Sequence, residues 1–233
     1  MKAVRDLILL ILSLSLMACQ DEAPEVVDFS EDYRYFPLET GFRRDYQVEE
    51  RVYRLNEAPQ QFRYQVREEI GEVFETVGDE MTYELLRYRR PSGNDNWQLD
   101  SVWLVRQSPD KIVRVENNLP FVALRFPLRE GRIWDGNVFN TRRRDDYTLT
   151  EVDVPQELAG NTFAHTLTVV QNADSSLVNK DVRTQIYARD TGMVFWHSEQ
   201  LFYCADPNDA CFGQNIIERG REITYTFLQA GKP

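Results

Sequence analysis

The chain has 233 residues, of which 42% are hydrophobic and 12% aromatic, a globular composition that excludes a mainly disordered protein. Its formal net charge of −11 argues against nucleic acid as a partner, because phosphate backbones are bound by clustered Lys and Arg. A chain of this length suits one large β domain that can bury a core without metals or disulfides.

Residues 1–18 are expected to form a signal-peptide helix. Lys2 and Arg5 supply positive charge, and an apolar run from Leu7 to Ala18 follows. At about 1.5 Å of rise per residue, this run is too short to cross about 30 Å of hydrocarbon as a permanent helix. A charged start, a short apolar stretch and a small residue before the cut are typical of a secretory signal.

The cleavage site resembles the lipobox of bacterial lipoproteins, in the run Leu16-Met17-Ala18-Cys19. The resemblance implies cleavage before Cys19 and attachment of acyl chains such as palmitate to that residue, which anchors a protein stably to a membrane. The alternative is an ordinary signal peptide with an accidental Cys. Residues 19–33 are acidic, with no basic residue before Arg34, and are expected to form a flexible tether.

The tether also carries information about the membrane. It resembles the acidic signal that sends Bacteroidetes lipoproteins to the cell surface, whereas the alternative is a plain acidic linker behind a periplasm-facing anchor. Gln20 stands where the inner-membrane retention signal of enteric bacteria has Asp. We therefore expect a lipid anchor in the outer membrane, with the protein exposed at the surface.

Apolar residues alternate with a period of two through residues 34–233, which predicts about ten strands. One such face carries Phe62, Tyr64 and Val66, and residues 91–96 have the composition of a hairpin turn. An antiparallel meander of this length hides its edges by curling. The predicted fold class is therefore all-β, a curved antiparallel sheet in the form of a half-barrel, barrel or sandwich.

A short internal repeat suggests how the domain is built. Tyr35-Phe36-Pro37-Leu38-Glu39-Thr40-Gly41 is echoed by Arg125-Phe126-Pro127-Leu128-Arg129-Glu130-Gly131. Pro fixes an extended entry, Phe and Leu dock as apolar groups, and Gly turns the chain into the next strand. The echo predicts two β-meanders within one domain, beginning near residues 35 and 125, unless the six-residue match is coincidence.

These segments, with Tyr187-Ala188-x-x-x-Gly192-Met193-Val194, resemble a group of uncharacterised Bacteroidetes lipoproteins over most of the mature chain. The motifs are turn and packing elements, so the resemblance implies fold and location rather than chemistry. Arg44 stands where such chains often have Trp, which is a departure from strict equivalence of the two halves.

Two cysteines remain besides the lipobox residue. Cys204 and Cys211 flank a Pro-Asn-Asp turn and are expected to form a disulfide outside the cytoplasm. A metal site would need more ligands than two thiols, and His165 and His197 lack zinc-finger spacing. No metal or cofactor is therefore expected.

No catalytic motif was found: Gly-x-Ser-x-Gly and His-Glu-x-x-His are both absent from the sequence. The leading hypothesis is a non-enzymatic envelope lipoprotein with a binding or structural role, whose protein partner the sequence does not identify. A second is a carrier of lipid or another apolar ligand, and a third is a surface hydrolase with a close carboxylate pair or a His–carboxylate contact. The carrier's cavity would be lined by aromatics that could equally be core, namely Trp97, Trp103, Trp134 and Trp196.

Overall fold

The structure, a computed structural model, describes residues 28–232, which form a single 12-stranded antiparallel sheet after one helical turn, α2 (Ser30–Tyr33). This confirms the predicted all-β class. The strands are β1 (Arg43–Tyr53), β2 (Gln60–Val77), β3 (Glu80–Arg90), β4 (Gln98–Ser108), β5 (Lys111–Glu116), β6 (Leu119–Arg125), β7 (Ile133–Asp135), β8 (Asp146–Leu158), β9 (Asn161–Ser175), β10 (Asn179–Ala188), β11 (Gly192–Tyr203) and β12 (Ile217–Gly231).

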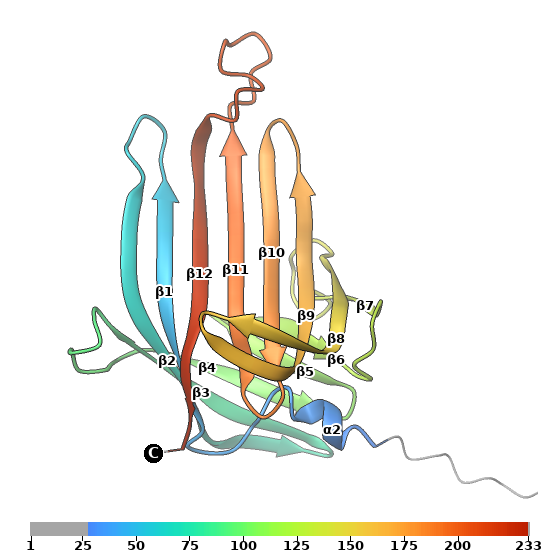
Figure 1. Ribbon diagram of the computed structural model, residues 1–233. Helices are drawn as coiled ribbons and strands as arrows, with labels where there is room; N and C mark the ends of the chain where they lie inside the picture. Colours follow the sequence, from blue (N-terminus) through green and yellow to red (C-terminus); the bar gives the residue numbers. More distant parts are fainter. Residues whose placement is uncertain (1–27, 233) are drawn as a thin grey trace, which may run out of the picture.

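The strand order divides the sheet into two meanders, because consecutive strands are neighbours except for β6 and β7, which lie at its two ends. The order is β6-β5-β4-β3-β2-β1-β12-β11-β10-β9-β8-β7, so the first six strands meet the last six along the β1–β12 ladder (Figure 1). The centre of the sheet is thus made by strands from opposite ends of the sequence.

The two repeated segments enter their meanders with matching hydrogen bonds. The amide of Gly41 donates to the carbonyl of Ile70 at 2.7 Å, and the amide of Gly131 donates to the carbonyl of Leu149 at 2.8 Å. Both glycines adopt left-handed backbone angles, with φ of 81° and 76°. Only glycine takes this conformation without a steric cost, which explains its place at both turns.

The outer strands of the sheet approach each other and nearly close it. The amide of Val122 in β6 donates to the carbonyl of Gly136, just after β7, at 2.9 Å. The indole of Trp134 in β7 donates to the carbonyl of Val122, also at 2.9 Å. The lower part of the molecule is therefore a nearly closed antiparallel barrel with an aromatic seam.

The core fills the inside of the curled sheet and receives the N-terminal segment at its base. Alternate strand residues such as Tyr46, Leu85 and Leu149 are buried there. Phe29 lies against Phe126 with a ring separation of 5.9 Å, so residues near α2 already dock on the fold within the stretch expected as tether. The signal peptide, Cys19 and the start of the tether lie outside the described residues.

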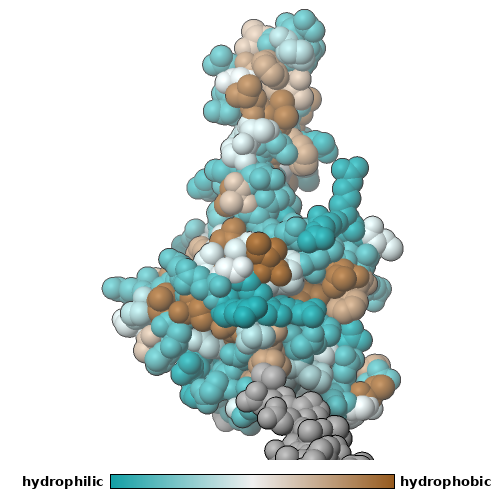
Figure 2. Space-filling view, turned by 90° about the vertical axis from the view of Figure 1, so that its right-hand side faces the viewer, coloured by the Kyte–Doolittle hydropathy of each residue, from teal (hydrophilic) through white to brown (hydrophobic). Residues whose placement is uncertain are grey.

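Beyond the barrel, six strands continue as a single layer. β3 pairs with β2 only as far as Gln65, and β8 pairs with β9 only as far as Val170. Past these points the remaining strands form what we call the projecting sheet: residues 49–64, 171–183 and 198–223. Figure 1 shows it rising above the barrel, and Figure 2 shows a narrow pillar over a wider body. Within residues 28–232, no helix is long and apolar enough to cross a membrane.

Candidate functional site

The projecting sheet buries few side chains, among them Leu201 and Ile223, and charged pairs link neighbouring strands on its faces. Opposite charges on adjacent strands stabilise a sheet, and they replace the second layer that usually covers it. The pairs across strands are Arg51–Glu222 (3.6 Å), Arg63–Glu49 (3.7 Å), Lys180–Glu199 (2.7 Å) and Arg221–Glu50 (2.8 Å), and Arg183 pairs with Asp181 of its own strand, β10, at 2.7 Å. The faces of the pillar are thus polar surfaces.

The tips of the projecting sheet are different, because they expose large apolar side chains. Leu55, Leu177, Phe202 and Ile216 come from three separate hairpin ends and are between 43% and 60% exposed. Figure 2 shows apolar residues gathered at the narrow upper end. These tips lie at the end opposite α2 and the C-terminus (Figure 1). Several exposed apolar side chains on one projecting end are typical of an interaction surface.

The predicted disulfide lies in the largest of these tips. Cys204 and Cys211 are bonded within the β11–β12 connection, with Cα atoms 5.8 Å apart. A carboxylate oxygen of Glu218 lies within 4.8 Å of both sulfur atoms, the only such grouping of potential metal ligands among residues 28–232. Because the sulfurs are bonded to each other, they are not available as thiolate ligands.

A groove runs beside the edge of β2 in the projecting sheet. β3 leaves β2 at the Gln65–Arg90 pair, so Gln60–Tyr64 has no strand neighbour on that side among the described residues. The groove has a volume of about 530 Å³. It is lined by Gln61, Phe62, Arg63, Tyr64, Arg89, Pro91, Gln98, Leu99 and Asp100.

The barrel interior contains a buried charge cluster that the sequence analysis did not identify. Glu68 accepts a hydrogen bond from Arg114 at 2.8 Å and lies 3.6 Å from Arg87, and Arg44 is buried near the same carboxylate. Burial alone would raise the pKa of Glu68, but the three guanidinium groups outweigh it and hold the pKa below its usual value. The sequence feature that could have revealed the cluster is a charged residue in a series of buried, every-second positions, as with Glu68 between Val66 and Ile70 in β2.

Two of the four predicted cavity aromatics, Trp103 and Trp196, are linked to this cluster through Arg87 and Tyr225. The guanidinium of Arg87 lies 3.8 Å from the ring centre of Trp103 and donates a hydrogen bond to the Tyr225 hydroxyl at 3.0 Å. The Tyr225 ring is 5.0 Å from that of Trp196. A ligand cavity at Trp103 and Trp196 stays a prediction.

The other two tryptophans lie elsewhere. Trp97 sits between the guanidinium groups of Arg67 (4.6 Å) and Arg90 (4.2 Å), and Trp134 packs against Tyr147 at the barrel seam. The structure therefore does not gather all four around one site.

A His–carboxylate contact exists at the base of the barrel, between His165 and Asp153 at 2.7 Å. Asp153 also accepts hydrogen bonds from Tyr35 (3.1 Å) and Arg189 (3.3 Å). The pKa of Asp153 is lowered, and the hydrogen bond with His165 contributes most to this shift. Burial and the neighbouring carboxylate raise the pKa of Tyr35 to about 12, so the phenol stays protonated at neutral pH and is a poor nucleophile. The cluster is best explained as a network that holds the N-terminal segment against β8 and β9.

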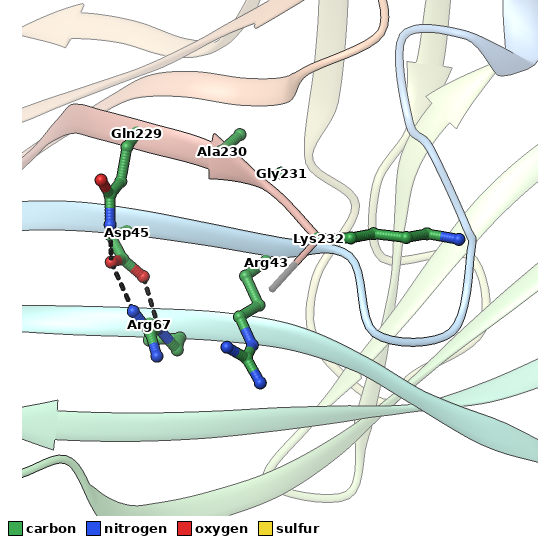
Figure 3. Close-up of a pocket in the computed structure, with 7 residues that line it drawn as sticks. All are labelled: Arg43, Asp45, Arg67, Gln229, Ala230, Gly231 and Lys232. Carbon is green, nitrogen blue, oxygen red and sulfur yellow. Dashed lines mark hydrogen bonds and ion pairs between the residues drawn. The ribbon is translucent and has the colours of Figure 1, made fainter.

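A small hollow of about 200 Å³ lies on β1, β2 and β12 near the C-terminus, and Figure 3 shows the side chains that line it. Arg67 donates to both carboxylate oxygens of Asp45, at 2.7 and 2.8 Å, and Gln229 donates to one of them at 2.8 Å. The other two cations of the hollow are also paired, Arg43 with Glu69 and Lys232 with Glu39. It therefore offers no surplus positive charge to an anion.

Two solved structures resemble this chain in shape, but no protein family does. No protein-family model matches the chain, and no curated protein matches it. Two crystal structures are similar in shape, each over 84% of this chain and 98% of the other. One is a presumed exported protein with YmcC-like fold from Bacteroides fragilis, with a TM-score of 0.46 and 10% identity. The other is a presumed lipoprotein from Parabacteroides distasonis, with a TM-score of 0.40 and 9% identity.

Proposed function

We propose that this chain is a non-enzymatic, lipid-anchored protein of the outer membrane that binds another protein through the tips of its projecting sheet. The observation that carries the proposal is the set of exposed apolar side chains at the end farthest from α2. The charged pairs on both sheet faces explain how this pillar remains in water without a second layer.

The anchor and the tips lie at opposite ends under this proposal. Lipid on Cys19 would hold the chain at the membrane, and an extended chain reaches at most about 3.5 Å per residue, so Asp28 would stay within roughly 30 Å of it. The base of the barrel would then face the membrane, and the tips would point away from it toward a partner.

The test is site-specific photocrosslinking in cells that carry the intact lipoprotein. A photoreactive residue at Leu177 or Phe202 should give an adduct of the same mass from both positions, whereas the same residue at Ile133, which is 60% exposed on the barrel, should give none. Cys19→Ser should release the protein from the membrane fraction and abolish the adduct. Equal crosslinking from Ile133, or none from the tips, would contradict the proposal.

One observation favours a second candidate, the carrier of a lipid or another apolar ligand. The indole N–H groups of Trp103 and Trp196 are buried and make no hydrogen bond to another described residue. Buried donors are normally satisfied, and an apolar ligand with an oxygen acceptor at its head would satisfy either one. Native mass spectrometry of the mature chain tests this, because a co-purifying lipid-sized mass would support the carrier and a clean protein mass would contradict it.

A further inference from the structure

We infer that the free edge of β2, at Gln60–Tyr64, is a docking site for an extended polypeptide segment of a partner protein, which adds one strand to the projecting sheet. This inference rests on the proposed binding function and specifies one of its contacts. Strand addition of this kind uses main-chain hydrogen bonds for affinity and alternate side chains for specificity.

The edge offers main-chain groups of Gln61–Arg63 that form no hydrogen bond on the open side with another described residue, whereas the Tyr64 carbonyl accepts one from the Gln47 side chain at 2.9 Å. Gln60–Tyr64 pairs with Val48–Val52 of β1 on one side only. In an antiparallel ladder, alternate residues direct both their N–H and C=O groups to the open side. Proteins usually protect such an edge, yet this one carries Phe62, which is 43% exposed.

The opposite edge of the projecting sheet, in β9, is protected. The amide of Asp174 donates to the side chain of Asn172 at 3.0 Å, and Asn172 also donates to Asp181 at 3.0 Å. The ladder to β10 shifts register between Asn172 and Val170. These features occupy or misalign the main-chain groups of β9 that a new strand would need. The β9 edge is therefore blocked and the β2 edge is open, as expected if only β2 accepts a partner strand.

The groove beside β2 indicates which side chains the segment carries. Phe62 and Leu99 offer apolar surface, and both are exposed. Arg89 stacks on Tyr64 at 3.7 Å and forms no ion pair with a described carboxylate, whereas Asp100 is already paired with Arg87 at 3.9 Å. The uncompensated charge is therefore positive, and the complementary segment has an acidic side chain beside an apolar one. Five residues at about 3.4 Å each give it a length of roughly 17 Å.

The inference is tested with a defined probe, a nine-residue peptide of alternating Val and Glu with blocked ends. Its binding to the lipidated protein in detergent micelles is measured by calorimetry. Arg89→Glu should weaken binding about tenfold, and replacing the peptide's Glu by Lys should restore it. Arg219→Glu is the matched control, because Arg219 also stacks on an aromatic ring of the projecting sheet, that of Phe202 at 4.2 Å. The Arg219→Glu variant should bind the peptide as tightly as the unchanged protein does.

A second probe separates strand addition from side-chain binding alone. The same peptide with every backbone amide methylated keeps its side chains but loses the donors of both edges, and it should not bind. Phe62→Ser serves as a second variant should Arg89→Glu fail to fold, as judged by circular dichroism. Equal binding of the methylated peptide, equal effects of the two Arg variants, or no binding at millimolar peptide would overturn the inference.

The outcomes also separate this inference from the proposed function. If the peptide fails while Leu177 and Phe202 still crosslink in cells, the docking edge is wrong and the binding role of the tips stands. If the protein in solution has twice its chain mass and the peptide does not displace the second copy, β2 pairs with itself and the partner segment is refuted.

Discussion

Removing the charge of Glu68 should destabilise the barrel strongly, because this carboxylate compensates the guanidinium groups of Arg44, Arg87 and Arg114 in the interior. Glu68→Gln keeps the shape of the side chain but removes the carboxylate that the three cations share, which leaves Arg114 with Glu116 (3.0 Å) and Arg87 with the more distant Asp100 (3.9 Å). Breaking a buried ion pair from one side costs about 3–5 kcal/mol. For a domain of this size, each kcal/mol shifts the melting midpoint by about 2–4 °C, so we expect a fall of about 6–20 °C.

The effect should depend on pH in a defined direction. The pKa of Glu68 is lowered in the folded protein, so its stabilising contribution is fully present above the ordinary carboxyl pKa of 4.5 and is lost as the pH falls through the folded-state pKa. Urea unfolding at pH 7 should show the full difference between Glu68→Gln and the unchanged protein, and unfolding near pH 3 should show a smaller one.

The neighbouring residue provides the control. Glu69 pairs with Arg43 at 2.9 Å on the partly exposed outer side of the sheet, so Glu69→Gln should cost no more than about 1 kcal/mol. If the two substitutions shift the urea midpoint equally at pH 7, or if the Glu68 effect does not diminish in acid, the buried cluster does not stabilise the fold as argued.

Gly41→Ala and Gly131→Ala should each lower the free energy of unfolding by about 1–2 kcal/mol. Both residues have left-handed backbone angles, and an added Cβ meets no atom within 4 Å, so the cost comes from backbone strain alone. An unchanged free energy of unfolding in urea for either variant would refute the shared turn geometry. Reduction of Cys204–Cys211 should add the mass of two hydrogens and destabilise the chain by at most about 2.5 kcal/mol, as closure of so short a loop allows; an unchanged mass on reduction would show that the disulfide is absent. Trp134→Phe should cost about 1 kcal/mol and speed hydrogen exchange of the β6 amides, since the seam loses its indole hydrogen bond; unchanged exchange would mean that the seam does not depend on the indole.

The strands and the entry turns could be predicted from the sequence because their causes are local. Alternation of apolar residues sets which face of a strand is buried, as with Tyr64 and Val66 in β2. A left-handed turn needs glycine, so Gly41 and Gly131 identified two equivalent positions, and the structure gives their amides equivalent partners in β2 and β8.

The projecting sheet could not be predicted, because local alternation does not reveal whether a second layer covers a strand. In hindsight the signal was present in consecutive charges, such as Glu49-Glu50-Arg51, which place charge on both faces of β1 at once. The interior cluster was missed for another reason. Its members come from four different strands, and the register that brings Arg87 and Arg114 to Glu68 depends on long-range pairing.

The position of β1 has a mechanical consequence. β1 begins directly after the base where the N-terminal segment enters, runs the length of the pillar toward the tips and is paired on both sides, with β2 and β12. A force applied at the tips and resisted at Cys19 would act along this strand. It would load the hydrogen bonds of both ladders in shear, all at once, instead of breaking them one after another as in peeling. β1, one of the two central strands of the sheet, would thus also resist tension best.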